Sequence, residues 1–234
     1  MKLIRHALMR LMRNKVVRRT LPNGRRLLVS PDAQLKYLGR GFDEDLVALA
    51  GTIAPGSVVW DVGANCGVFA FSCDPTCDVL GIEADPFLAD LLRRSAVGSN
   101  VRVLEKAVAS ETGSVEFSIA AHGRASNHLA KVSGNSMSGG ERERINVAAT
   151  TLDDLLSSEP APAFVKIDVE GAEVEVLMGA TRLLSEIRPT LYLEISDDTR
   201  AACEAILRNH DFVWRRGAEM NWLCLPAESQ SSTA

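Results

Sequence analysis

A short apolar run, an acid and a glycine-containing turn constrain this chain more than any other segment. The run is Val58–Val62, and the turn continues to Gly67. Phe69–Ser72 then reads as the start of a helix, so the segment predicts a strand, a tight turn and a helix. Glycine permits positive φ and leaves the backbone bare, and the first amides of a helix are unpaired donors. A nucleotide-like cofactor is the ligand that this arrangement predicts.

The spacing of the glycines separates the cofactor classes. Gly63 and Gly67 have three residues between them (G-x-x-x-G), whereas dinucleotide-binding turns follow G-x-G-x-x-G and phosphate loops follow G-x-x-x-x-G-K-[ST]. Neither a nicotinamide dehydrogenase nor a nucleoside triphosphatase is therefore the first expectation.

Strand and helix patterns alternate along most of the chain. The expected strands are Val58–Val62, Val79–Glu83, Val101–Glu105, Val115–Ile119, Phe164–Asp168 and Thr190–Ile195. The expected helices are Asp43–Ile53, Gly67–Ser72, Pro86–Ser95, Thr151–Leu156, Ala172–Leu184 and Thr199–Arg208. Phe212–Trp214 and Asn221–Leu225 predict a closing hairpin. This alternation predicts an α/β protein with a doubly wound, mainly parallel sheet that binds ligands at its carboxyl edge.

The length of 234 residues suits one sizeable domain. We expect a basic arm and the start of a hairpin over residues 1–30, a domain over 31–227 and a disordered tail over 228–234. Ala121–Arg144 is rich in glycine and polar residues, and we expect it to be a functional lid or a disordered loop.

The arm is strongly basic. It holds nine basic residues and no acid through Pro31, and its apolar residues from Leu3 to Met12 recur at helical spacing. A peripheral membrane helix, a helix packed on the domain and a cleaved transit peptide all fit this pattern.

The five cysteines are an odd number in a chain too large to need disulfides, which favours free thiols in a reducing compartment. We therefore expect a cytoplasmic location, with membrane association through the arm as a further option. No apolar stretch is long enough to span a bilayer.

Several acids fall where the predicted strands end. Glu83 follows the turn by about 20 residues, the position from which an acid binds ribose hydroxyls in nucleoside-binding sheets. In a strand, Lys166, Asp168 and Glu170 share one face. Such a cluster favours a nearby positive charge, or it is an acidic helix start. Glu194 ends the next strand within reach of Asp168.

The acid pair and the lid histidines are the candidates for chemistry. Asp168 and Glu194 could share a proton or bind a divalent ion, and we expect no metal because neither a histidine nor a third oxygen ligand is evident. His122 and His128 lie in the expected lid, where either could be a general base or simply be solvated.

The motifs together resemble the FkbM family of methyltransferases. They are Val59–Gly67, Glu83–Pro86, Thr151–Leu155 and Lys166–Glu173, in that order, with Gly113, Gly179–Ala180 and Glu194 also fitting. The resemblance runs from about Phe42 to Pro226. It implies the class I methyltransferase fold, Rossmann-like with seven strands, and S-adenosylmethionine (SAM) as the cofactor.

The resemblance also implies roles for individual residues. Those implied to line the methionine and ribose side of SAM are Asp61, Gly63, Ala64, Asn65 and Gly67. Glu83 would hold the ribose hydroxyls, and Ala107 and Val108 would lie beside the adenine. This chain has Lys106 where many class I enzymes have an acid.

Many members of the family methylate hydroxyl oxygens of sugars, polyketides or other small molecules. We therefore expect O-methylation of a small-molecule or glycan hydroxyl, with Asp168, Glu194 or His128 as the base or orienting group. A SAM-binding protein without catalysis is one alternative. A nucleic-acid methyltransferase is another, although the acidic body and the 5% aromatic content make nucleic acid an unlikely partner.

Overall fold

A seven-stranded sheet forms the centre of the computed structural model, which describes residues 8–9, 11–39, 41–131, 140–217 and 220–227. Its strands are β3 (Val58–Val62), β4 (Asp78–Glu83), β5 (Val101–Glu105), β10 (Phe164–Ile167), β11 (Thr190–Glu194), β12 (Phe212–Arg216) and β13 (Asn221–Pro226). They lie in the order β12-β13-β11-β10-β3-β4-β5. The five from β11 to β5 are parallel, and β13 is antiparallel to both of its neighbours, β11 and β12. The predicted mainly parallel sheet and the closing hairpin are confirmed.

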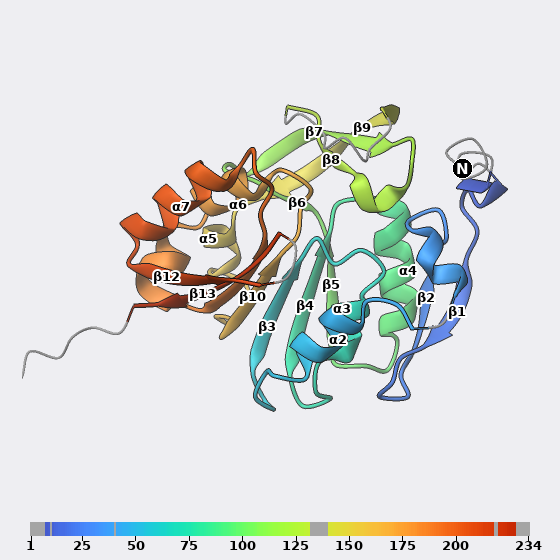
Figure 1. The fold of residues 1–234 in the computed structure, drawn as a ribbon, viewed down its shortest axis with the longest axis horizontal. Coiled ribbons are helices and arrows are strands. Elements are labelled where there is room, and N and C mark those ends of the chain that lie inside the picture. The colour runs from blue at the N-terminus through green and yellow to red at the C-terminus, as the bar shows by residue number, and fades with distance from the viewer. Residues whose placement is uncertain (1–7, 10, 40, 132–139, 218–219, 228–234) are drawn as a thin grey trace, which may run out of the picture.

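Helices cover both faces of this sheet (Figure 1). The helices of one face are α2 (Glu44–Ala50), α3 (Val68–Ser72) and α4 (Pro86–Ala96), and those of the other are α5 (Leu152–Leu155), α6 (Glu173–Met178) and α7 (Arg200–Asn209). Strand residues alternate between the two cores, because successive side chains point to opposite faces. Val59 thus packs in the first core and Trp60 in the second.

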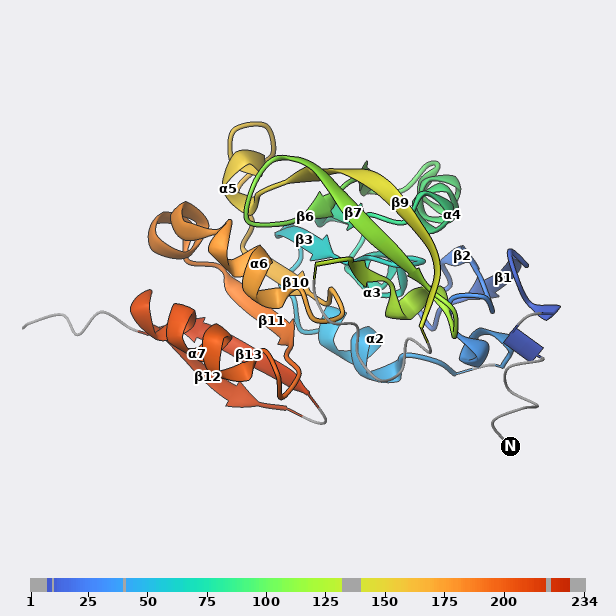
Figure 2. The same ribbon diagram turned by 90° about the horizontal axis from the view of Figure 1, so that it is seen from above.

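A second, smaller sheet lies across the carboxyl edge of the large one (Figures 1 and 2). Its strands are β6 (Ala107–Val108), β7 (Gly113–Ala120), β8 (His128–Leu129) and β9 (Glu141–Thr150), in the order β6-β9-β7-β8. The 3-10 helix η2 (Arg124–Ser126) joins β7 to β8. This sheet supplies a roof over the carboxyl ends of the large sheet.

The small sheet corrects the prediction of a long loop over Ala121–Arg144. That segment contains η2, β8 and the beginning of β9, while residues 132–139 lie outside the described residues. β9 was missed because its first half is charged and exposed. Its stability comes from a long antiparallel ladder with β7, in which Val115 pairs with Val147 and Phe117 with Ile145.

The N-terminal hairpin is confirmed. β1 (Val17–Thr20) and β2 (Arg26–Val29) pair in antiparallel register, and Gly24 adopts a φ of 83° in the turn between them. Leu27 and Val29 are buried in the same core as α3 and α4, and the Leu28 amide donates to Ser95 Oγ over 2.8 Å. The hairpin therefore shares a core with the domain expected from residue 31, as does the short helix η1 (Leu35–Leu38).

Most of the predicted arm helix and the predicted disordered tail over 228–234 lie outside the described residues. Within the described part of the chain, no helix combines the length and apolar character needed to cross a bilayer.

The single helix predicted over Ala172–Leu184 is wrong, because it is divided in two. α6 ends at Met178, and the π-helix η3 covers Leu183–Ile187. A Cβ on Gly179 would lie 2.4 Å from the carbonyl oxygen of Ala109, so this chain crossing requires glycine. Asp153 then accepts hydrogen bonds from the amides of Arg182 and Leu183, each over 2.9 Å, and so starts the second piece.

Candidate functional site

A cavity of about 850 Å³ opens at the carboxyl ends of the central strands. It lies where the sheet order reverses, because β4 and β5 follow on one side of β3 while β10 and β11 lie on the other. Open α/β sheets bind their ligands at such a switch point. The volume falls within the range of small-molecule and cofactor pockets.

The predicted turn forms the floor of this cavity at the end of β3. Gly63, Asn65 and Gly67 have φ angles of 75°, 51° and 86°, so the turn is left-handed at three positions. A Cβ on Gly63 would lie 1.9 Å from the carbonyl oxygen of Asp168, and one on Gly67 would lie 2.4 Å from Leu92 Cδ1. Neighbouring protein atoms thus leave no room for a side chain at either position, so both positions require glycine. Gly63, Ala64 and Asn65 line the cavity, whereas Gly67 starts α3 beneath it.

Glu83 ends β4 beside this turn. Its two carboxylate oxygens accept hydrogen bonds from the amides of Asn65 and Asp85, each over 2.8 Å. Burial raises the pKa of Glu83 to about 7, while these two amides oppose the shift. Each oxygen retains a second lone pair, so the side chain can still accept from a ligand hydroxyl. Ala107 and Val108, the residues expected beside an adenine, line the same part of the cavity.

A row of polar residues crosses the sheet at the other side of the turn. Lys166 on β10 is in register with Asp61 on β3 and with Tyr192 on β11. The Lys166 ammonium lies 3.4 Å from Asp61 Oδ1 and 3.1 Å from Asp168 Oδ2. Burial acts against the charge on Lys166, but Asp168 and Asp61 outweigh it and raise its pKa.

Asp61 is completely buried within this row. Its two carboxylate oxygens accept no hydrogen bond from the described residues, although both are shielded from solvent. Burial raises its pKa and the Lys166 charge opposes that shift. A buried acceptor of this kind is costly unless it has a donor. The partner that the structure gives it is the Lys166 ammonium, 3.4 Å from Oδ1.

Asp168 and Glu194 meet at the carboxyl ends of β10 and β11, as predicted. The charge on Asp168, together with burial, raises the pKa of Glu194 to about 7, and a hydrogen bond between the two carboxyl groups contributes to the shift. Glu194 therefore changes protonation near neutral pH. Such a group can take a proton from an acceptor hydroxyl that enters the cavity.

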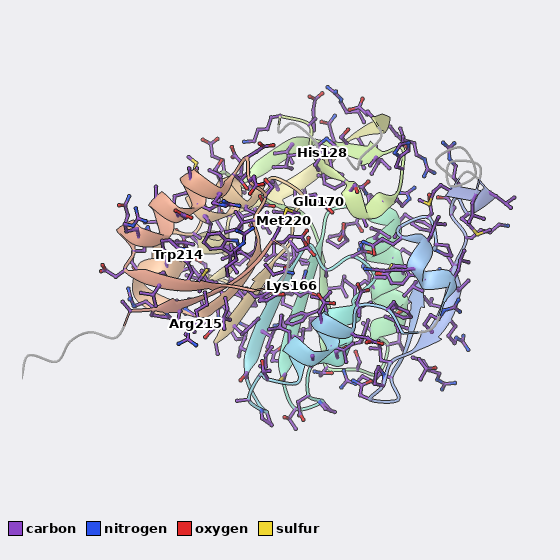
Figure 3. The ribbon with its side chains drawn as sticks, in the orientation of Figure 1. His128, Lys166, Glu170, Trp214, Arg215 and Met220 are labelled. Atoms are coloured by element: carbon purple, nitrogen blue, oxygen red, sulfur yellow. The ribbon has the colours of Figure 1, made fainter. Side chains whose placement is uncertain are left out.

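The remaining acids of the cluster have different surroundings. Glu170 was expected on the face of Lys166 and Asp168 by strand periodicity, but β10 ends at Ile167 and Glu170 adopts a φ of 51°. It still lines the cavity, and Figure 3 shows it above Lys166. Glu173 is buried and accepts from the Gly171 amide, so the alternative of an acidic helix start applies to this residue.

The two histidines of the expected lid differ in their position relative to the cavity. His128 lies on β8 in the roof, and its Nδ1 is 3.1 Å from the carbonyl oxygen of Ser126 (Figure 3). It is not among the residues that line the cavity, whereas His122 is. The position of His128 thus differs from that expected of a base. Among the residues described, no group of three or more histidine, cysteine or acidic side chains is placed to hold a metal ion.

Several residues on the cavity wall were missed at the sequence level. Tyr192 lies two residues before Glu194 on the same strand, so strand periodicity could have placed both on one face. Asp43 and Asp45 also line the cavity from the start of α2, although acids at a helix start are common for reasons of helix stability alone. Arg124 lies in the glycine-rich lid, and no local pattern indicates its role.

Arg124 joins three segments that are distant in sequence. Its guanidinium donates to Asp85 Oδ2 over 2.6 Å and to Asp32 Oδ2 over 3.1 Å, and it lies 4.7 Å from the centre of the Phe87 ring. Arg142 binds Asp32 as well. We call Arg124, Arg142, Asp32 and Asp85 the clasp. It fixes η2 and the N-terminal segment beside Glu83, because the Asp85 amide is one of the two donors to Glu83.

Comparison with known proteins agrees with this geometry. Residues 61–219 match the model of the methyltransferase FkbM domain. The hexuronic acid methyltransferase AglP of Haloferax volcanii is 30% identical over 176 residues, which cover 67% of this chain and 69% of that protein.

Two solved structures show a similarity to this chain. FkbM methyltransferase from Methylobacillus flagellatus has a TM-score of 0.49 at 20% identity, covering 75% of this chain; the chain spans 45% of the length of that protein. TYW2 from P. horikoshii in complex with MeSAdo has a TM-score of 0.49 at 10% identity, covering 91% of this chain and 70% of that one. Because the family model matches more than half of its sequence and a 30% identical relative is covered over two thirds of its length, the chain belongs to the FkbM family of SAM-dependent methyltransferases.

Proposed function

We propose that the protein transfers the methyl group of SAM to a hydroxyl oxygen of a sugar or glycan. The observation that carries this proposal is the pair of carboxyl groups on Asp168 and Glu194, which line the same cavity as the glycine turn. Family membership supports SAM as the methyl donor. The relative that is named for its action on hexuronic acid supports a sugar as the class of acceptor.

The residues of the cavity fit SAM. Its ribose hydroxyls would complete the hydrogen bonding of Glu83, and Ala107 and Val108 would form an apolar wall for the adenine. The buried Asp61 carboxylate lies beside the turn residue Gly63 and would act on SAM through its charge, because its oxygens are shielded from solvent. An acidic wall also favours a ligand that carries a sulfonium and an ammonium group.

Bound SAM would supply a methyl group that is already activated on its sulfonium sulfur. The protein then has to align the acceptor oxygen and remove its proton. Glu194 would accept that proton, since its pKa lies close to neutral pH. Asp168 would keep Glu194 basic through its negative charge, and the Lys166 ammonium would fix Asp168 from the other side. Alignment of this kind can lower a barrier by about 7–11 kcal/mol in favourable cases.

Two further expectations stay predictions. A cytoplasmic location is consistent with the five buried, free cysteines. Membrane contact through the basic arm depends largely on residues outside the described part of the chain.

Transfer of radiolabelled methyl from SAM to simple glycosides tests the proposed function. We expect turnover by the unaltered chain, and a loss of about 10²–10⁴ in kcat for Glu194→Gln, the range that general bases contribute. Asp168→Ala should abolish turnover while the circular dichroism spectrum and the Kd for SAM stay unchanged. SAM binding without transfer to any acceptor would instead identify a SAM-binding protein, and near-normal kcat in Asp168→Ala would remove that residue from the mechanism.

A further inference from the structure

One end of the cavity has a distinctive set of side chains. It is lined by Asp43 and Asp45 from the start of α2, Tyr192 and Glu194 from β11, and Asn221 from β13. Glu194 and Asn221 are partners in the register of β11 and β13. We call these five residues the acceptor end, because they include the carboxyl group that would take the proton from an acceptor.

The acceptor end carries excess negative charge. Asp43 is neutralised by an ion pair with Lys36, and Lys166 lies between Asp61 and Asp168. Asp45 and Glu194, in contrast, form no ion pair with any of the residues described. Burial, and after it the charge on Asp45, raises the pKa of the Tyr192 phenol to about 12, so the field of Asp45 reaches into the site.

The adjoining wall does not offset this charge, because the Lys166 ammonium is shared between Asp61 and Asp168. A ligand carboxylate placed beside Asp45 and Glu194 would therefore meet like charges. An ammonium group in the same place would meet opposite charges, and at short range this difference is large because the site is partly shielded from water.

Resting on the proposed function, we propose that the acceptor end selects its substrate by charge: it takes a hydroxyl of an amino sugar and rejects a uronic acid. Tyr192 offers a ring face and a hydroxyl, and Asn221 offers amide hydrogen bonds, which suit a polyhydroxylated ring. Asp45 and Glu194 supply the charge that pairs with the amino group. Substrate choice would thus differ from that stated in the name of AglP, which refers to hexuronic acid.

Three probes that share one ring test this proposal: the methyl glycosides of glucosamine, glucose and glucuronic acid. Their binding to the full chain loaded with S-adenosylhomocysteine is measured by calorimetry, at low and high salt. We expect the amino sugar to bind tightest and the uronate weakest, with at least about a tenfold difference in Kd between them. Higher salt should narrow this difference, because it screens the charge at the cavity mouth.

Asp45→Asn removes one charge from the acceptor end and leaves the proposed base in place. In this variant the Kd of the uronate divided by the Kd of the amino sugar should fall about threefold or more. The Kd for SAM should stay unchanged. Asp90→Asn is the matched control, since Asp90 pairs with Arg94 on the exposed side of α4 and does not line the cavity. We expect the Asp90→Asn variant to have the same ratio of uronate Kd to amino-sugar Kd as the unaltered chain.

The binding measurements test whether the acceptor end selects by charge. The methyl-transfer assay separately tests the proposed function. Equal or tighter binding of the uronate, or an unchanged ratio in Asp45→Asn, overturns the charge proposal even if sugars are methylated. The expected binding order without transfer to any of the probes would support the charge proposal and count against hydroxyl methylation of these sugars.

Discussion

Gly63 shows how one residue couples the turn to the catalytic cluster. Its φ of 75° favours glycine, and a Cβ at this position would collide with the carbonyl oxygen of Asp168. The end of β3 and the end of β10 can approach each other only because this side chain is missing. Gly63 therefore places Asp168, and its role is not confined to contact with a cofactor.

Gly63→Ala and Gly98→Ala separate backbone strain from this collision. Both glycines are left-handed, with φ angles of 75° and 74°, but a Cβ on Gly98 would meet no atom within 4 Å. We expect Gly98→Ala to lower the free energy of unfolding by about 1–2 kcal/mol. Gly63→Ala should lower the free energy of unfolding by about 1–3 kcal/mol more than Gly98→Ala does, because the new Cβ collides with the Asp168 carbonyl oxygen. Urea denaturation of both variants measures the difference, and equal losses would refute the role of the collision.

Glu194 predicts the pH dependence of turnover. Its pKa is raised to about 7 chiefly by Asp168, and only the deprotonated carboxylate can accept a proton. The kcat should therefore rise with pH below about 7 and level off above it. Replacing Asp168 by Asn removes the main cause of the shift, so the Glu194 midpoint should fall towards the usual value of about 4.3. Carbon NMR of the Glu194 carboxyl in both proteins measures the midpoint, and an unchanged midpoint would contradict this account.

At the scale of elements, the clasp connects the roof to the large sheet. Arg124 from η2 holds Asp85 at the start of α4 and Asp32 from the N-terminal segment, and all three side chains are buried. The Asp85 side chain also accepts from the Phe87 amide, which begins α4. One guanidinium thus orders the roof, a helix start and the chain that precedes η1.

Loss of this connection should be costly. Arg124→Ala leaves Asp85 buried without its charge partner, and breaking a buried pair typically costs about 3–5 kcal/mol of unfolding free energy. We expect SAM affinity to fall as well, since Asp85 positions Glu83. Arg144→Ala is the control, because Arg144 forms exposed pairs with Glu116 and Glu141, and pairs in water contribute little to stability. Thermal unfolding and calorimetry compare the two, and similar losses would argue against the clasp.

At the scale of the whole molecule, the cavity draws on the entire sheet and on its coverings. Its walls come from β3, β4, β10, β11 and β13, from α2, and from the roof. A ligand that fills such a site binds the folded chain alone, so it should stabilise the whole domain.

SAM should therefore raise the midpoint of thermal unfolding. At a hundred times its Kd, a ligand adds about 2.7 kcal/mol, which corresponds to a shift of about 5–10 °C for a domain of this size. NAD at the same concentration should give no comparable shift. Asp61→Asn should reduce the shift by SAM, because it removes a negative charge beside the turn that favours a cationic ligand. Differential scanning fluorimetry measures the unfolding midpoint with SAM, with NAD, and with SAM in the Asp61→Asn variant. A larger shift with NAD than with SAM would exclude the proposed cofactor.

The sequence predicted the elements whose signals are local. The strand Val58–Val62 and the helix that begins at Pro86 follow from apolar patterns, glycine and proline, and the Thr151 side chain caps α5 as expected. β9 and the break after Met178 were missed, because the first depends on pairing with β7 and the second on contact between Gly179 and Ala109. Such contacts join residues far apart in the chain and leave no local pattern.

The same division holds for the function. The order of the motifs determined the family, and the ends of adjacent strands placed Asp61, Glu83, Asp168 and Glu194 at one edge, because parallel strands present their carboxyl ends together. Only the tertiary structure decided that Arg124 binds Asp85 and Asp32, that His128 is not among the residues lining the cavity, and that Asp45 and Tyr192 both line it. Those features depend on how the coverings pack over the sheet, and that packing is set by contacts between distant segments rather than by the spacing of residues along the chain.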